Sequence, residues 1–268
     1  MGSPDIDRWI LDNTQAGHSF ETLLERLVGS GWPYATALEA LEKTLGKPAV
    51  PVYKVGERGR RVTVQGHPIE VVMTMASPPI TLFRHLLSDE ECDALIKAAE
   101  PRLTSSCVVS DQTGDNVPHD ARVSDGMFFQ VGEMPLLDQI EDRIADLVAW
   151  PKDRGEAIQV LRYNVGGKYD PHYDYFNPAV PGSAKPLQQG GNRVGTLIMV
   201  LQAPEAGGGT VFPDVGLELL AQKGDGIFFS YDRPHPSTKS LHGGAPVVQG
   251  VKWIATKWLR QRATGGNG

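Results

Sequence analysis

Hydrophobic residues recur at helical spacing in three short segments within the first 46 residues of the chain. Within each segment they fall mostly three or four positions apart, so they gather on one face of a helix while polar residues occupy the other face. The three faces carry Ile6, Trp9 and Ile10; Phe20, Leu23, Leu24, Leu27 and Val28; and Ala37, Leu38, Leu41 and Leu45. The pattern predicts a small helical bundle over residues 1–46.

The next segment, residues 47–80, is rich in Pro and Gly and contains two short β-like runs at 61–64 and 69–75. We expect a linker followed by the first strands of a larger domain. Ser88 and Glu91 then form a capping-box pattern, which predicts the start of a helix. A strand is expected over 122–130 and a second amphipathic helix over 136–150.

From residue 157 onward short apolar runs alternate with turns that are rich in Gly, Pro and Asp. Strands are expected at 157–163, 169–176, 194–202, 209–212, 217–221, 226–231 and 253–259. Many short strands of this kind are typical of a sandwich or barrel. We therefore predict a mainly β (α+β) fold: a double-stranded β-helix, or jelly roll, with supporting helices over 81–262 and a flexible tail at 263–268.

Composition narrows the functional classes. The chain has 268 residues, 40% of them hydrophobic, which is ordinary for a globular protein. A net charge of -6 argues against nonspecific binding of nucleic acid. No apolar run reaches membrane-spanning length, and the first seven residues lack the basic and apolar regions of a secretion signal. Two cysteines, Cys92 and Cys107, are too few for a disulfide framework. We expect a cytoplasmic protein, monomeric or homodimeric, without a membrane or nucleic-acid partner.

Candidate metal chemistry lies in the β-rich half. On an extended strand His172 and Asp174 point to the same face, and His242 offers one more imidazole. Two histidines and one carboxylate are the ligand set of a non-haem Fe(II) site with open positions. Lys252, ten residues past His242, can anchor a carboxylate. The alternative for each histidine is a structural role, with its imidazole hydrogen-bonded within the sheet. His235 is a rival to His242 as the third metal ligand, although the prolines beside it favour a loop.

Three stretches then carry a family resemblance: 161–174, 207–213 and 242–258. They resemble, in order and spacing, the motifs of the prolyl 4-hydroxylase family of 2-oxoglutarate- and Fe(II)-dependent dioxygenases, and the resemblance extends over roughly 80–260. It implies that iron is bound by His172, Asp174 and His242; that 2-oxoglutarate is bound by Lys252, Tyr163 and Thr196; and that Arg193, Trp258 and Arg260 contact the substrate. For Arg193 and Arg260 the alternative is a solvated charge at a strand end, and for Trp258 a place in the core.

The resemblance implies an O2-dependent hydroxylase, most directly of prolyl residues in a peptide or protein, with succinate and CO2 as coproducts and ascorbate as a candidate reductant. Two departures affect the substrate cleft: Gly209 stands where the family commonly has an acidic residue, and Val123 where it commonly has threonine. A free amino acid or other small molecule is therefore an alternative substrate. A metal-binding jelly-roll scaffold without catalysis is a third reading. We expect loops 110–120 and 177–192 to be mobile and to close over the substrate.

Overall fold

The computed structural model describes residues 6–18, 20–46, 50–105, 107–109, 116–118 and 122–264. Contacts divide the chain into two units, Met1–Ala49 and Val50–Gly268. Most of the 110–120 loop, with its expected closure, lies outside the described residues.

The first unit is a three-helix bundle made of α1 (Ile6–Gln15), α2 (Phe20–Gly29) and α3 (Tyr34–Leu45). The hydrophobic faces expected from the sequence pack together, and the buried positions are Ile10, Leu23, Leu24, Leu27, Ala37 and Leu41. Asp7 joins the first and third helices, because its carboxylate accepts a 2.8 Å hydrogen bond from the Thr44 hydroxyl. The bundle thus has a small core of its own, reinforced by a polar contact at its edge.

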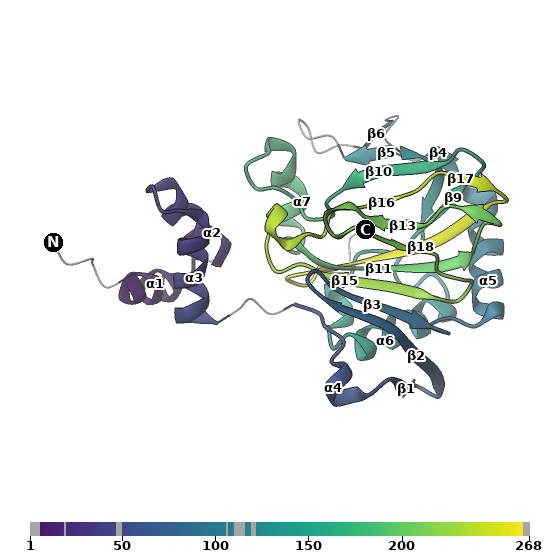
Figure 1. Ribbon diagram of the computed structural model, residues 1–268, viewed down its shortest axis with the longest axis horizontal. Coiled ribbons are helices and arrows are strands. Elements are labelled where there is room, and N and C mark those ends of the chain that lie inside the picture. Colours follow the sequence, from purple (N-terminus) through teal and green to yellow (C-terminus); the bar gives the residue numbers. More distant parts are fainter. Residues whose placement is uncertain are drawn as a thin grey trace. The chain divides into compact units, whose positions relative to one another are not determined.

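The second unit is built around two antiparallel sheets (Figure 1). In sheet order the nine strands of the larger sheet are β1 (Arg61–Val64), β2 (His67–Ala76), β3 (Pro79–Arg84), β15 (Gly226–Ser230), β11 (Arg193–Gln202), β18 (Lys252–Arg260), β9 (Gln159–Tyr163), β8 (Asp125–Phe128) and β4 (Thr104–Ser105). The five strands of the smaller sheet are β14 (Leu217–Leu219), β13 (Thr210–Phe212), β16 (His242–Gly244), β10 (Lys168–His172) and β7 (Arg122–Val123). Two further pairs join β12 (Ala206–Gly207) to β17 (Val247–Gln249) and β5 (Cys107–Val109) to β6 (Asn116–Pro118).

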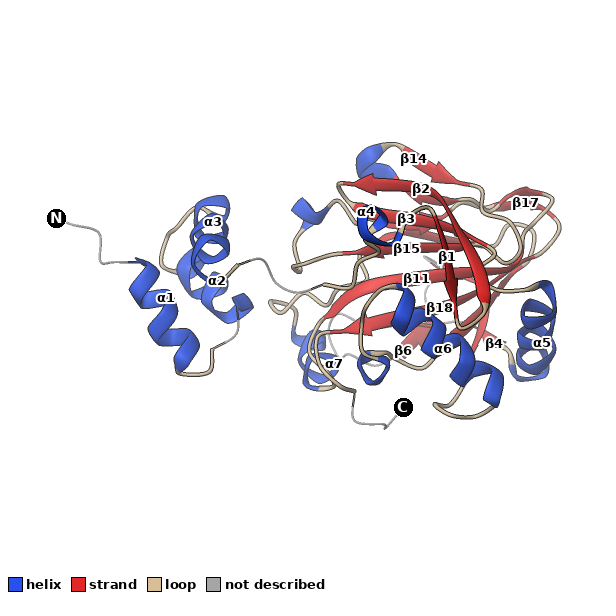
Figure 2. Ribbon diagram, turned by 90° about the horizontal axis from the view of Figure 1, so that it is seen from below, coloured by secondary structure: helices blue, strands red, loops and turns tan. Residues whose placement is uncertain are grey.

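Helices cover the outer face of the larger sheet (Figure 2). Two of these helices are α5 (Asp89–Ala99) and α6 (Pro135–Leu147). Two further helices of this unit, α4 (Val55–Arg58) and α7 (Ala184–Gln188), are short. Short 3-10 turns occur at Glu100–Arg102, Lys152–Arg154, Pro181–Ser183, Pro213–Val215 and Pro236–Thr238. The capping box at the start of α5 is present, since Ser88 and Glu91 exchange side-chain-to-backbone hydrogen bonds. Glu91 also binds the buried Arg143 of α6 at 2.7 Å, which ties the two helices together.

Strand β11 contributes side chains to two hydrophobic cores, one on each face of the larger sheet. Its side chains alternate between faces, as they do in any strand. Leu197 and Met199 belong to the core beneath the helices, whereas Ile198 and Val200 belong to the core between the sheets. Thr196 has the same parity as the second pair, so it faces the interior of the jelly roll. This explains why nearly the whole strand is buried.

The expected strand at 169–176 is wrong in its second half. β10 ends at His172, after a register irregularity between Tyr169 and His172. The backbone N–H and C=O of Phe176 bind the Asn192 side chain, at 2.9 and 2.8 Å, instead of a neighbouring strand. The side chain of one distant residue thus replaces strand pairing there.

Two other expectations need correction. The segment 122–130, expected as one strand, is split between β7 of the smaller sheet and β8 of the larger one. The loop 177–192 contains α7 and a 3-10 turn rather than irregular chain alone.

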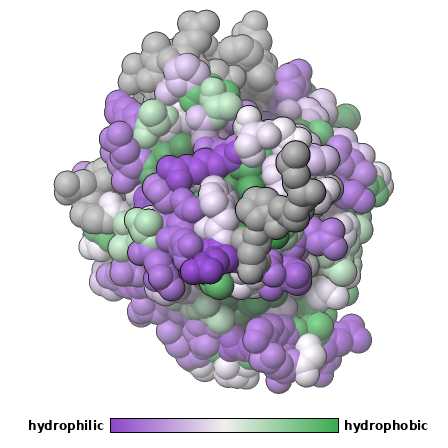
Figure 3. Space-filling model, turned by 90° about the vertical axis from the view of Figure 1, so that its left-hand side faces the viewer, coloured by the Kyte–Doolittle hydropathy of each residue, from purple (hydrophilic) through white to green (hydrophobic). Residues whose placement is uncertain are grey.

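Among the described residues, no helix has both the length and the apolar character needed to cross a membrane. On the face drawn in Figure 3, hydrophilic residues are widespread and hydrophobic ones appear in small groups.

Candidate metal centre and active site

His172, Asp174 and His242 converge between the two sheets. The two histidines lie directly opposite each other in the antiparallel pair of β10 and β16. Asp174 follows β10 and turns its carboxylate between them, with Oδ1 3.4 Å from Nε2 of His172 and Oδ2 3.4 Å from Nε2 of His242. One potential ligand atom from each residue lies within 4.8 Å of the others.

Both imidazoles are held in the orientation that a metal ligand needs. Nδ1 of His172 lies 3.0 Å from the carbonyl of Asp170, and Nδ1 of His242 lies 3.0 Å from the carbonyl of Ser240. A carbonyl only accepts hydrogen bonds, so each Nδ1 carries the proton and each Nε2 keeps a lone pair directed toward Asp174. The ring of Tyr169 stacks on that of His172 with centroids 3.8 Å apart, which restricts the imidazole further.

The protonation states also fit a metal site. Burial lowers the pKa of His242 to about 4, so this imidazole is neutral near pH 7. Burial alone would raise the pKa of Asp174, but His242, His172 and Arg193 outweigh it and hold the pKa below its ordinary value. A neutral imidazole and an ionised carboxylate are the forms that bind a divalent ion.

The donor set matches Fe(II) with two histidines and one carboxylate. Within the described ranges, no other group of three or more His, Cys, Asp and Glu side chains is placed to hold a metal. His235, the rival in the sequence, lies outside the group: its Nδ1 accepts a 3.1 Å hydrogen bond from the backbone N–H of Ser237. The sequence preference for His242 over His235 agrees with this geometry.

Lys252 lies on the opposite wall of the cavity that contains the three residues. Its side chain is 6% exposed, and Nζ donates a 2.6 Å hydrogen bond to the carbonyl of Gly208. Gly207 and Gly208 have φ values of 73° and 68°, a conformation that favours glycine, and the turn they form brings this carbonyl to the lysine. Tyr163 is the register partner of Lys252 on β9.

No carboxylate in the described part of the chain pairs with Lys252. Burial lowers the pKa of this lysine to about 8, so the ammonium form still predominates at pH 7. A buried cation without a counter-ion is unfavourable. The arrangement therefore favours an anionic ligand, such as the carboxylate of a 2-oxo diacid, between Lys252 and the metal ligands.

Thr196 lines the same cavity but contacts Asp174 rather than Lys252. Its Oγ1 donates a 2.7 Å hydrogen bond to Oδ2 of Asp174 and lies 2.9 Å from the hydroxyl of Tyr231. Burial and the nearby Asp174 raise the pKa of Tyr231 well above its ordinary value, so this hydroxyl keeps its proton. The expected cosubstrate contact of Thr196 stays a prediction, and the structure gives the hydroxyl a different partner.

Thr210 is a candidate that the sequence reasoning missed. It is buried on β13, directly after the glycine-rich turn, and lines the cavity together with Lys252. The available signal was its place in the 207–213 stretch, where a hydroxyl follows three glycines. Its position makes it the better candidate for a hydroxyl beside Lys252.

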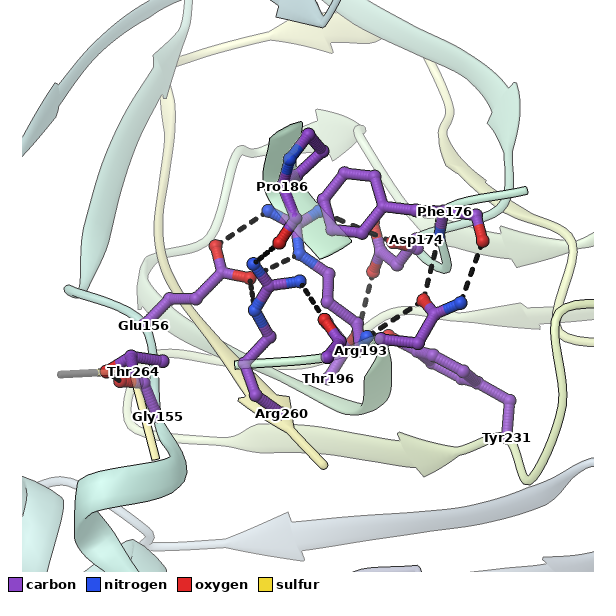
Figure 4. Close-up of polar contacts among 12 residues, drawn as sticks. Gly155, Glu156, Asp174, Phe176, Pro186, Arg193, Thr196, Tyr231, Arg260 and Thr264 are labelled. Carbon is purple, nitrogen blue, oxygen red and sulfur yellow. Dashed lines mark hydrogen bonds and ion pairs between the residues drawn. The ribbon is translucent and has the colours of Figure 1, made fainter. Parts of the chain in front are cut away.

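Arg193 and Arg260 share one carboxylate, that of Glu156 (Figure 4). Nε and Nη2 of Arg193 bind the two Glu156 oxygens at 2.7 and 2.8 Å, and Nε of Arg260 lies 3.0 Å from one of them. Arg260 also donates to the carbonyls of Gly191 and Pro186, at 2.9 and 2.8 Å. Neither arginine belongs to the cavity lining, and the solvated-charge alternative is wrong for Arg260, which is 3% exposed.

Glu156 was not identified from the sequence, because nothing near it in the chain indicates that two arginines lie beside it. Burial opposes its ionisation, but Arg193 and Arg260 outweigh that effect and lower the pKa of its carboxyl group. Arg193 further donates to the backbone carbonyl of Asp174 at 3.4 Å. The cluster thus supports the wall that carries a metal-ligand candidate.

Trp258 joins this wall to the cavity. The guanidinium of Arg193 lies 4.0 Å from the centre of its ring, and the indole lines the cavity. The side chain is 8% exposed, and its Nε1 has no hydrogen-bond partner among the described residues. A buried N–H without an acceptor is rare in folded proteins. The indole N–H is therefore a donor that the described protein groups leave unsatisfied, on a residue that lines the cavity.

Comparison with known proteins gives consistent matches. A model of the 2OG-Fe(II) oxygenase superfamily matches residues 158–260. Prolyl 4-hydroxylase 5 of Arabidopsis thaliana is 38% identical over 203 residues, which are 68% of this chain and 68% of the relative. Probable prolyl 4-hydroxylase 4 of the same plant is 35% identical over 216 residues, 72% of this chain and 71% of the relative.

A solved structure is similar as well. It is the viral collagen prolyl hydroxylase of Paramecium Bursaria Chlorella virus-1 in complex with 2OG, with a TM-score of 0.52 and 30% sequence identity. The match covers 68% of this chain and 95% of the viral protein.

Proposed function

The chain belongs to the prolyl 4-hydroxylase family of the 2OG-Fe(II) oxygenase superfamily, and from that premise we propose that it hydroxylates prolyl residues in a peptide or protein. It is an Fe(II)- and 2-oxoglutarate-dependent dioxygenase. The family resemblance and the jelly-roll fold class inferred from the sequence are confirmed. The finer parts of the proposal, namely residue roles and substrate, follow from the geometry of the site.

We assign iron binding to His172, Asp174 and His242, and the distal carboxylate of 2-oxoglutarate to Lys252. When bound there, iron and 2-oxoglutarate would supply the oxidation by O2 of an unactivated C–H bond, in which one oxygen atom enters the product hydroxyl, the other enters succinate, and CO2 is released. The ammonium of Lys252 would hold the cosubstrate carboxylate through a charge-assisted hydrogen bond in a site shielded from water. Thr210 and Tyr163 complete the polar end of the cavity.

The observation that carries the peptide assignment is the unpartnered Nε1–H of Trp258, buried at the cavity wall. A peptide segment around a prolyl residue offers backbone carbonyls that can accept from this donor. The prolyl ring is apolar and packs well against aromatic faces, and Trp258 and Tyr169 both line the cavity. The similar plant and viral proteins are named as prolyl hydroxylases, which supports the same substrate class.

The two departures from the family pattern affect this assignment differently. Val123 is 49% exposed, so it offers an apolar surface where a hydroxyl is common in the family. At Gly209, a Cβ would meet Oε1 of Glu218 at 2.3 Å, so the Glu218 carboxylate occupies the space that a side chain at 209 would need. An acidic group is therefore retained at this place from the neighbouring strand β14. Val123 is then the departure behind the alternative of a free amino acid or other small molecule as substrate.

The first experiment titrates the protein anaerobically with Fe(II) and 2-oxoglutarate and follows the visible charge-transfer band of the chelate. We expect the band in the wild type and its loss in His172→Ala. Mass spectrometry of proline-rich peptides after turnover, with ascorbate present as reductant, should then show the gain of one oxygen atom. Succinate release with free amino acids but not with any such peptide would refute the peptide assignment. Absence of the band in the folded wild type would refute the residue assignments.

A further inference from the structure

The carboxylate of Asp174 is fixed from one side by a chain of two hydroxyl groups. Oγ1 of Thr196 lies 2.7 Å from Oδ2, and the Tyr231 hydroxyl lies 2.9 Å from Oγ1 (Figure 4). All three side chains are buried, with exposures of 6% for Asp174, 0% for Thr196 and 2% for Tyr231. Solvent therefore competes little with this chain of contacts.

The direction of the hydrogen bonds follows from the groups involved. An ionised carboxylate only accepts hydrogen bonds, so Thr196 must donate its single hydroxyl proton to Oδ2. The remaining contact of the Thr196 oxygen is then an acceptor, and Tyr231 must be the donor. The order is Tyr231 to Thr196 to Asp174. In this arrangement Thr196 has no proton left to donate to a cosubstrate.

Thr196 and Tyr231 are both held by backbone hydrogen bonds of the larger sheet. Thr196 lies on the central strand β11, opposite Phe229 on one neighbouring strand and Trp258 on the other. Tyr231 directly follows β15, and its backbone N–H donates a 3.0 Å hydrogen bond to the carbonyl of Val194 on β11. Asp174 itself lies beyond the end of β10, so its side chain lacks the support that strand pairing gives to His172 and His242.

We infer that Thr196 and Tyr231 are positioning residues that hold the Asp174 carboxylate through Oδ2 and leave Oδ1 for the metal ion. This inference rests on the proposed function, because it assumes that Asp174 is a metal ligand. It replaces the cosubstrate contact that the family resemblance implies for Thr196. Hydrogen-bonded groups around a ligand commonly affect metal affinity about 10- to 100-fold, which sets the size of the expected effect.

The test compares Thr196→Val, which keeps the branched shape and removes the hydroxyl, with Thr196→Ser, which keeps the hydroxyl. Fe(II) affinity is measured anaerobically without 2-oxoglutarate, by competition with a chelator, and thermal unfolding shows that each variant is folded. We expect Thr196→Val to weaken Fe(II) binding roughly 10- to 100-fold and Thr196→Ser to stay within a few-fold of the wild type. Tyr231→Phe should give a smaller loss and add little in the double variant with Thr196→Val, because Tyr231 acts through Thr196.

Three outcomes overturn the inference or its premise, and they can be told apart. Equal Fe(II) affinity in the folded wild type, Thr196→Val and Thr196→Ser would refute the positioning role. A raised KM for 2-oxoglutarate with unchanged Fe(II) affinity in Thr196→Val would restore the cosubstrate contact instead. Failure of the wild type itself to bind Fe(II) would remove the proposed function on which the inference depends.

Discussion

Lys252 and Tyr163 lie directly opposite each other in the register of β18 and β9, and Nζ of the lysine is 5.8 Å from the centre of the tyrosine ring. The ammonium thus lies beside an aromatic ring and donates a hydrogen bond to one carbonyl, that of Gly208. Neither carries a full negative charge. Binding of a carboxylate at this point therefore satisfies a cation that the protein alone leaves uncompensated.

Replacing Lys252 with methionine tests this directly, because methionine keeps an unbranched stem and removes the charge. A hydrogen bond to a charged group contributes about 1.5–3 kcal/mol, so we expect KM for 2-oxoglutarate to rise roughly 10- to 100-fold. Fe(II) affinity without the cosubstrate should stay unchanged. The matched control is Lys223→Met, which removes a lysine paired with the exposed Asp93. If both variants raised KM equally, a specific role of Lys252 would be excluded.

The lowered pKa of Lys252 predicts a pH dependence of cosubstrate binding. In the free protein the pKa is about 8, so the ammonium predominates below this pH and is lost above it. Only the ammonium attracts a carboxylate, and the Kd for 2-oxoglutarate should therefore rise by roughly tenfold between about pH 7 and about pH 9. Charge-transfer titrations across this range provide the measurement. Lys252→Arg should bind with a flat profile, since a guanidinium stays charged throughout; a parallel rise in this variant would attribute the effect to another group.

The sequence contained the parts of the site that lie in continuous motifs. His172, Asp174, His242 and Lys252 were identified because their spacing and residue types match one kind of metal chemistry, and the all-β pattern after residue 157 predicted the scaffold. The predicted strand at 169–176, which carries His172 and Asp174, is too long, because β10 ends at His172. Its end depends on Asn192, whose amide binds the Phe176 backbone across 16 positions of sequence.

Contacts made across longer distances in the chain could not be inferred in this way. Glu156 meets Arg193 only because its backbone N–H bonds to the carbonyl of Trp258 on β18, which in turn pairs with β11. Tyr231 reaches Thr196 only through the register of β15 on β11. Residue types alone do not specify such partners, because a buried carboxylate or hydroxyl looks the same in sequence as an exposed one. The supporting groups around the metal ligands therefore required the fold.

Glu156→Gln tests the cluster of buried charges. The substitution keeps the shape of the side chain but removes the carboxylate that Arg193 and Arg260 share, and breaking a buried ion pair typically destabilises a protein by about 3–5 kcal/mol. We expect a loss near the lower end of this range in urea unfolding, because Glu156 is 20% exposed. Asp125→Asn is the comparison, since its pair with Arg162 is roughly 30% exposed on both sides. It should change the free energy of unfolding by less than about 1 kcal/mol. A loss no larger for Glu156→Gln than for Asp125→Asn would contradict the structural role of the cluster.

Trp258→Phe tests whether the unpartnered indole N–H binds the substrate. The change keeps an aromatic face beside Arg193 and removes the donor. A net contribution of about 1 kcal/mol from one hydrogen bond corresponds to a rise of roughly fivefold in KM for a proline-rich peptide. KM for 2-oxoglutarate should not change, because the cosubstrate is bound at the Lys252 end of the cavity.

The matched control for this variant is Trp150→Phe. The Nε1 of Trp150 already donates a 2.9 Å hydrogen bond to the carbonyl of Arg260, away from the cavity lining. Removing this donor should lower the stability of the fold and leave KM for the peptide unaltered. Equal peptide KM values for the wild type and Trp258→Phe, with both proteins folded, would mean that the indole N–H finds its acceptor elsewhere than in the substrate.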